Sequence, residues 1–169
     1  MTGDSTARGP EHLPTLLGRI VTDLTVRSVA DEALGELRTP RFGAARIVPI
    51  GRAWRLGVLL LDRDGALYAT GSVTRAIVPQ RGVANKSPDA EVRREFRRAA
   101  ARGRFAEGEV VNFGVARLAL DAASLDAGSG PLRMLDGEVS VLWNPADPAR
   151  GLRPIADYLV ERAALTEPR

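Results

Sequence analysis

The chain has 169 residues, 44% of them hydrophobic, which is enough for one domain to bury a core without metal ions or disulfide bonds. It contains no cysteine, which excludes disulfide bonds, thiol nucleophiles and zinc sites with thiolate ligands. The formal net charge is only +3, and Lys86 is the only lysine among 24 basic residues, an arginine bias typical of GC-rich bacterial genomes. We therefore expect a cytoplasmic bacterial protein, and the net charge alone implies no anionic partner.

The N-terminal residues 1–12 lack the basic start and the apolar stretch of a secretory signal, so we expect a flexible leader there. This leader contains His12, the only histidine of the chain. From residue 13 onward, leucine and isoleucine recur at helical spacing and predict an amphipathic helix. The following "SVADEALGELR" predicts a second helix, in which Ser28 and Asp31 are arranged as in a capping box.

The central part of the chain predicts strands. "RIVPI", which begins at Arg46, predicts a short strand at a sheet edge because Pro49 interrupts it. Next, the apolar run Leu56–Leu61, an Asp-Gly turn and the strand "LYATGSVT" predict a hairpin whose first strand is buried on both faces. The hydroxyl groups that alternate along "LYATGSVT" are typical of a solvent face, and the alternative is a polar ligand site.

Later segments predict further strands and a last helix. "EVVNFGVARLALD" predicts one long strand bent at Gly114, and "LRMLDGEVSVLW" predicts a second hairpin that turns at Asp136 and Gly137. The segment 122–131 is expected to be a flexible connection. The chain closes with a predicted helix that has Pro154 in its first turn.

Together these elements predict an α+β fold with a single domain over residues 13–169. We expect an antiparallel or mixed sheet of five to seven strands, packed by N-terminal, central and C-terminal helices. The longest apolar run falls far below the roughly 20 residues of a membrane-spanning helix, so no membrane partner is expected.

Charge is distributed unevenly along the chain. Residues 37–104 contain fifteen basic and five acidic residues, whereas the two flanking parts have net charges of −3 and −4. Within this basic part, residues 37–61 contain five arginines interleaved with Phe42 and Trp54, and no acidic residue. The asymmetry indicates an anionic partner, unless the fold pairs the basic part with the acidic flanks.

A helix predicted over residues 87–103 has one apolar and one cationic face. The apolar face consists of Val92, Phe96, Ala99, Ala100 and Gly103, and the cationic face of Arg93, Arg94, Arg97, Arg98 and Arg102. In one hypothesis these arginines form weak ion pairs with Asp89, Glu91 and Glu95 on a solvated surface. In the other, unpaired arginines, among them Arg102 and Arg104, contact phosphates or an acidic protein face.

Lys86 and Ser87 stand at the start of this helix, where backbone amides and the helix dipole favour an anion. The segment does not match a Walker A loop, which needs glycines where this chain has Gln80 and Asn85. Asp89 already offers a negative charge to the same helix end. The alternatives are therefore a bound phosphate and an ordinary capped helix start.

Groups for catalysis or metal binding are scarce. His12 lies in the expected leader, which argues against a catalytic triad or a histidine-ligated metal. The "DRDG" segment lacks the later ligands of a calcium loop and is explained by its turn. Glu107 and Glu109 could act as an acid and base pair, but no pattern places them in one cleft.

Three classes of function follow from these patterns. The first is a binding domain for nucleic acid or another phosphate-bearing polyanion, with Phe42 and Trp54 able to stack on bases. The second is a self-associating or partner-binding structural protein, and the third an enzyme for a small anionic substrate. No cofactor is expected. The candidate anion-binding residues are Arg93, Arg94, Arg97, Arg98, Arg102, Lys86, Ser87, Arg52, Trp54 and Arg55.

Overall fold

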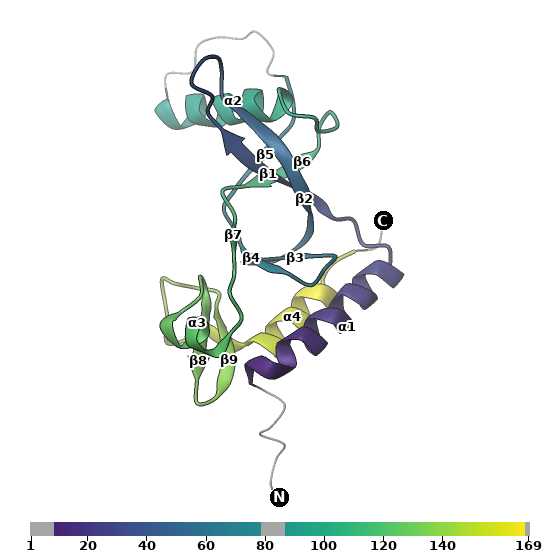
Figure 1. Ribbon diagram of the computed structural model, residues 1–169, viewed down its shortest axis with the longest axis vertical. Coiled ribbons are helices and arrows are strands. Elements are labelled where there is room, and N and C mark those ends of the chain that lie inside the picture. The colour runs from purple at the N-terminus through teal and green to yellow at the C-terminus, as the bar shows by residue number, and fades with distance from the viewer. Residues whose placement is uncertain (1–8, 79–86, 168–169) are drawn as a thin grey trace, which may run out of the picture. The chain divides into compact units, whose positions relative to one another are not determined.

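The computed structural model describes residues 9–78 and 87–167 (Figure 1). In these residues, four α-helices and ten strands are formed. The helices are α1 Leu13–Val26, α2 Pro88–Ala101, α3 Ala122–Ala127 and α4 Ile155–Ala164, with a short 3-10 helix, Pro10–His12, directly before α1. The strands are β1 Glu32–Arg38, β2 Arg46–Leu56, β3 Leu59–Asp62, β4 Leu67–Ala69, β5 Ser72–Arg75, β6 Val110–Phe113, β7 Ala116–Arg117, β8 Leu132–Leu135, β9 Glu138–Leu142 and β10 Leu152–Pro154.

Two sheets are present among the described residues. One has seven strands in the order β5-β6-β1-β2-β3-β4-β7, and the other has three in the order β10-β9-β8. The larger sheet is mixed, because β1 pairs parallel with β6 and antiparallel with β2. The predicted α+β class, with an antiparallel or mixed sheet of five to seven strands and helices from the N-terminal, central and C-terminal parts of the chain, is confirmed by this mixed sheet of seven strands. No helix in the described ranges is both long and apolar enough to cross a membrane.

The chain divides into two compact units that alternate along the sequence. Unit 1 contains Met1–Ala30, Trp54–Ala69 and Ala116–Arg169, and unit 2 contains Asp31–Ala53 and Thr70–Val115. Unit 1 includes α1, α3, α4 and the small sheet, whereas unit 2 includes α2 with β1, β5 and β6.

Unit 1 has a core of large apolar side chains. The leucines of the Leu56–Leu61 run are fully buried, as predicted, but the run is not one strand. Gly57, at a φ of +66°, turns the chain between β2 and β3, and a Cβ there would overlap the Tyr158 hydroxyl. On α4, Ile155, Leu159 and Ala163 are buried at helical spacing, which confirms the predicted packing face of the last helix.

The small sheet of unit 1 confirms the second predicted hairpin. β8 and β9 pair antiparallel around Asp136 and Gly137, which both have positive φ values, as the two central residues of a type I′ turn require. The segment 122–131 is not a flexible connection, because it contains α3. The Asp121 carboxylate caps this helix: it accepts hydrogen bonds from the Ser124 hydroxyl and from the Ser124 amide, and both lower the pKa of Asp121.

The second predicted N-terminal helix is wrong, since its residues form β1. Ser28 has a φ of +54° instead of the extended conformation of an N-cap residue. Gly35 explains the strand: it lies so close to Ile47 and Val111 of the neighbouring strands that even a Cβ would overlap them. Tertiary packing therefore overrides the helical propensity of this segment.

β2 is longer than the predicted "RIVPI" strand. Its pairing with β1 shifts register between Leu34 and Gly35, opposite Gly51 and Pro49, so that Ile50 is an extra residue. A proline lacks the N–H that a regular ladder needs, and the bulge interrupts the ladder, so Pro49 is tolerated there.

Two predicted long strands are each divided. "LYATGSVT" forms β4, which pairs with β3 and β7, and β5, which pairs with β6. "EVVNFGVARLALD" forms β6 and β7, separated at Gly114, which has a φ of +64°. The predicted bend at Gly114 is thus confirmed, although the strands on its two sides have different partners.

Candidate functional site

The basic residues are concentrated in unit 2. This unit contains thirteen basic and eight acidic residues, a net charge of +5, whereas unit 1 contains eleven and thirteen, a net charge of −2. The excess of basic over acidic residues along residues 37–104 is therefore also found in one of the two structural units.

Helix α2 covers one face of the unit 2 strands (Figure 1). Its start agrees with the sequence prediction, because Ser87 is the extended N-cap residue and Pro88 follows, although the Ser87 hydroxyl makes no capping hydrogen bond. Ala99 and Ala100 are buried, and the Phe96 ring packs on Phe113 with centroids 4.8 Å apart.

The predicted apolar face of α2 is only partly correct. Val92 is 51% exposed, so the helix is packed mainly by its C-terminal half. Of the arginines in this helix, Arg93 and Arg97 are exposed, whereas Arg94 and Arg98 are partly buried.

One row of these arginines is ion-paired along the helix. Arg94 lies 3.6 Å from Glu91, and Arg98 lies 3.2 Å from Glu91 and 3.4 Å from Glu95. Arg102 is also paired, with Glu95 at 3.3 Å, which corrects its predicted unpaired state. Each of these exposed pairs contributes only a few tenths of a kcal/mol, about 0.3–0.5.

A second row has no acidic partner. Arg93 and Arg97, one helical turn apart, are exposed and make no ion pair or side-chain hydrogen bond among residues 9–78 and 87–167. The same holds for Arg104, just beyond the helix. Asp89, which the ion-pair hypothesis assigned as a partner of these arginines, forms no ion pair with Arg93 in the described residues.

The loop between β1 and β2 carries further basic residues next to the end of α2. Arg102 donates a hydrogen bond to the carbonyl oxygen of Ala45, at 3.0 Å. Gly103 lies against the backbone of Ile47, where a Cβ would overlap the Ile47 carbonyl oxygen. Arg46 lies between Ala45 and Ile47, and Arg104 follows Gly103. These contacts therefore bring Arg46 and Arg104 to the same end of unit 2.

This loop also exposes an aromatic ring. Phe42 is 86% exposed, and its described ring contact is with the guanidinium of Arg41, whose Cζ lies 6.0 Å from the ring centroid. Arg41 and Arg46 are both exposed and, in the described chain, have no carboxylate partner. The five exposed arginines without acidic partners, Arg41, Arg46, Arg93, Arg97 and Arg104, together with Phe42, are called the basic surface below.

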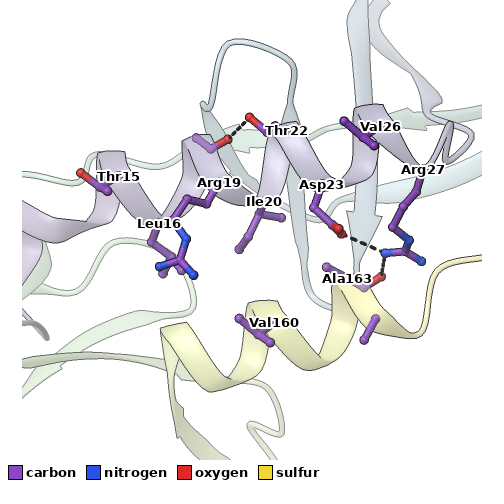
Figure 2. A pocket seen from close by; sticks show the side chains of 12 residues that line it. Thr15, Leu16, Arg19, Ile20, Thr22, Asp23, Val26, Arg27, Val160 and Ala163 are labelled. Carbon is purple, nitrogen blue, oxygen red and sulfur yellow. Dashed lines mark hydrogen bonds and ion pairs between the residues drawn. The ribbon is translucent and has the colours of Figure 1, made fainter.

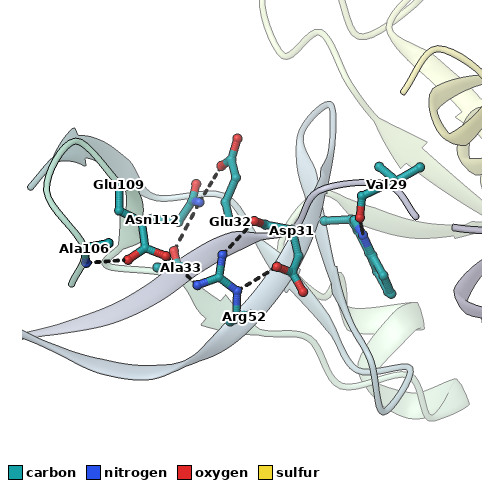
Figure 3. Close-up of polar contacts among 9 residues, drawn as sticks. Val29, Asp31, Glu32, Ala33, Arg52, Ala106, Glu109 and Asn112 are labelled. Atoms are coloured by element: carbon teal, nitrogen blue, oxygen red, sulfur yellow. Dashed lines mark hydrogen bonds and ion pairs between the residues drawn. The ribbon is translucent and has the colours of Figure 1, made fainter. Parts of the chain in front are cut away.

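Arg52 does not belong to this surface. Its guanidinium is held between two carboxylates: it bonds Asp31 at 2.6 Å and also pairs with Glu109 (Figure 3). The hydrogen bond from Arg52 lowers the pKa of Glu109, and hydrogen bonds to Asp31 and Glu109 raise that of Arg52. Because the positive charge is already neutralised, Arg52 is a structural residue and a poor phosphate ligand.

The neighbouring polar residues continue this structural network. The buried Asn112 side chain donates to the Glu32 carboxylate at 2.6 Å, and the Glu109 carboxylate also accepts from the amide of Ala106 (Figure 3). A carboxyl group with a lowered pKa stays ionised at neutral pH, so Glu109 is unsuited to act as a general acid there. This agrees with the sequence analysis, in which no pattern placed Glu107 and Glu109 in one cleft as an acid and base pair.

Two other predicted site residues lie in unit 1. Trp54 is only 1% exposed, and its indole N–H donates to the carbonyl oxygen of Val29 at 2.9 Å, so it cannot stack on a base. A signal was available in the sequence, since Trp54 lies two residues before the buried apolar run Leu56–Leu61. Arg55 is half-buried and has interactions of its own. Lys86 lies outside the described residues.

A groove between α1 and α4 was not predicted (Figure 2). It has a volume of about 1140 Å³ and a largely apolar lining that includes Leu16, Ile20 and Val160. Arg27 closes one end by donating to the carbonyl oxygens of Ala163 and Thr166, at 2.9 and 2.5 Å. The available signal was the apolar residues on the outward faces of both helices, such as Val26, which is 78% exposed.

In the described residues, no group of three or more His, Asp or Glu side chains could hold a metal ion. The Asp62 carboxylate instead accepts hydrogen bonds from the amides of Asp64 and Ala66 and from the Tyr68 hydroxyl, as the turn interpretation predicted. No protein-family model, curated protein or solved structure matches the chain.

Proposed function

We propose that the chain binds nucleic acid or a similar polyanion through the basic surface of unit 2. The observation that carries the proposal is the row of Arg93 and Arg97, which α2 presents without acidic partners beside a fully ion-paired row. An arginine without a partner can neutralise a phosphate without first breaking an ion pair. Arg104 and the β1–β2 loop add further charge at one end of the unit.

The proposed contacts are with phosphates and therefore carry no base information. We expect weak binding that is similar for unrelated sequences and falls steeply with salt. The α2 arginines 94, 98 and 102 contribute less, because their charge is offset by Glu91 and Glu95.

The test compares two double variants by fluorescence anisotropy with a labelled oligonucleotide. Arg93→Ala with Arg97→Ala removes two unpaired charges, so the log–log slope of affinity against salt should shrink by about 1.4 to 1.8. Glu91→Ala with Arg98→Ala removes one carboxylate and one guanidinium, together with the three ion pairs that they make among the described residues, and leaves the net charge unchanged. Affinity should therefore stay within about twofold. Equal losses in both variants would contradict the proposal, as would a wild type that does not bind at low salt.

A second candidate function, self-association, is supported by the α1–α4 groove. Val26, Val160 and Leu165 expose apolar surface on these two helices, and a second copy of the same face would cover it. Arg19 on α1 and Asp157 on α4 are exposed and have no ion-pair partner among the described residues, so a two-fold arrangement can pair them across the interface.

Sedimentation of the wild type and of Val160→Glu tests this candidate. If two copies pack through the groove, the wild type sediments as a dimer and the variant as a monomer with unchanged circular dichroism. A wild type that is monomeric at high micromolar concentration rules self-association out.

A further inference from the structure

Packing within the chain does not explain the exposed position of the Phe42 ring. It is the most exposed of the large apolar side chains among the described residues, at 86%, and it packs on no core residue. A single exposed apolar residue is common on protein surfaces and is not informative alone. The ring of Phe42, however, lies beside the guanidinium of Arg41, whose Cζ is 6.0 Å from the ring centroid, and Arg46 follows in the same loop region.

The loop that carries Phe42 is tied to the rest of unit 2 at its base. Arg38 and Arg46 form the last register pair of β1 and β2, and the Ala45 carbonyl oxygen accepts a hydrogen bond from Arg102 of α2. Gly43, at a φ of +100°, turns the chain directly after the ring. The aromatic ring is thus presented beyond an anchored hairpin, and arginines flank it.

From this arrangement we infer that the ligand is single-stranded nucleic acid, with Phe42 stacked on an unpaired base while the arginines contact the flanking phosphates. The inference rests on the function proposed above and specifies its substrate class. Bases of a duplex are stacked on each other, and only an unpaired base offers its flat face to an exposed ring. Every base has such a face, so the expected recognition is tolerant of sequence.

The experiment measures the affinity of the wild type, Phe42→Ala and Phe42→Trp for a labelled single-stranded thymidine oligomer and for a duplex of equal length. We expect the wild type to prefer the single strand. Phe42→Ala should weaken single-strand binding about tenfold, the scale of one lost base–aromatic stack, and leave duplex binding within about twofold. Phe42→Trp should retain or strengthen single-strand binding. A ribonucleotide oligomer, measured in parallel, distinguishes RNA from DNA as the preferred strand.

Polyphosphate provides the control, because it has charge but no bases. Its affinity should fall in the Arg93→Ala, Arg97→Ala variant and stay unchanged in Phe42→Ala. If Phe42→Ala binds the single strand as well as the wild type while the arginine variant has lost affinity, the stacking inference is wrong and the proposed function stands. If the wild type binds neither strand, duplex nor polyphosphate, both are wrong.

Discussion

The two units of this chain are built from different kinds of contact. Unit 1 buries large side chains, among them Trp54, Tyr158 and many leucines. The unit 2 core consists of alanines with Ile47, Val111 and Phe113, and it depends on backbones that approach closely at glycines. Unit 1 leaves a groove that is apolar, whereas unit 2 leaves a surface of arginines. Unit 2 therefore has the smaller core side chains and also most of the positive charge.

Replacing Trp54 of unit 1 and Phe42 of unit 2 should give the largest difference between the two units. Trp54→Ala should lower the free energy of unfolding by about 4 kcal/mol, because it empties a core position and leaves the Val29 carbonyl oxygen without its donor. Phe42→Ala should change it by less than about 0.5 kcal/mol. Urea denaturation followed by far-UV circular dichroism measures both, and a comparable loss in the two variants would show that Phe42 packs in solution.

Glycine substitutions test the close approach within unit 2. Gly71→Ala should destabilise the protein by about 2 kcal/mol, because its Cβ would overlap the carbonyl oxygens of Phe113 and Gly114, which belong to the backbone and cannot rotate away. Gly18→Ala is the matched control in α1 of unit 1. No atom lies within 4 Å of the added Cβ, so this variant should stabilise by about 0.5–1 kcal/mol. Opposite signs in thermal denaturation are expected, and a stabilised Gly71→Ala would contradict the packing of β5 against β6.

The Arg52 cluster tests the role of ion pairs in unit 2. Arg52→Ala should cost about 1 kcal/mol at neutral pH, a value discounted for the half-exposed guanidinium, since it leaves the mostly buried carboxylates of Asp31 and Glu109 facing each other. Arg38→Ala, whose pair with Glu36 is exposed, should cost less than about 0.5 kcal/mol.

The effect of Arg52 should depend on pH in a defined direction. Because Arg52 lowers the pKa of Glu109 below its ordinary 4.5, this stabilisation is complete above pH 4.5 and is lost as the pH falls through the lowered pKa. The difference in unfolding free energy between wild type and Arg52→Ala should therefore be constant near neutrality and shrink in acid. A difference that grows on acidification would exclude this assignment.

Sequence patterns predicted those features that depend on local chemistry. The α2 start at Ser87 and Pro88, the hairpin turn at Asp136 and Gly137, and the buried leucine run are examples, since capping, positive φ and apolar runs are properties of short segments. The β1 strand was missed because its helical propensity is overridden by packing around Gly35. The division of two long strands was also missed, because their separate pairing partners are distant in sequence.

Only part of the candidate site was predicted from the sequence, because Arg52 is held by two carboxylates and Trp54 is buried. Helical periodicity placed the arginines of α2 on an outer face, but it could not divide them into the paired row of Arg94 and Arg98 and the unpaired row of Arg93 and Arg97. On a helix, an acidic residue can pair with an arginine three or four residues away, and the sequence alone does not show which of these ion pairs forms. Phe42 is exposed because it lies in the loop between β1 and β2, and Trp54 is buried near the end of β2. Both positions depend on where these strands begin and end.

Binding of phosphates by unit 2 can be measured through the salt dependence of nucleic-acid binding by the wild-type protein. If the five arginines of the basic surface contact phosphates of a single strand, the slope of log affinity against log salt concentration should be about −3.5, from about −0.7 for each contact. The slope should fall in magnitude to about −2.1 when Arg93 and Arg97 are replaced by alanine. A slope near zero, or one that these replacements leave unchanged, would contradict the assignment of unit 2 as a polyanion-binding surface.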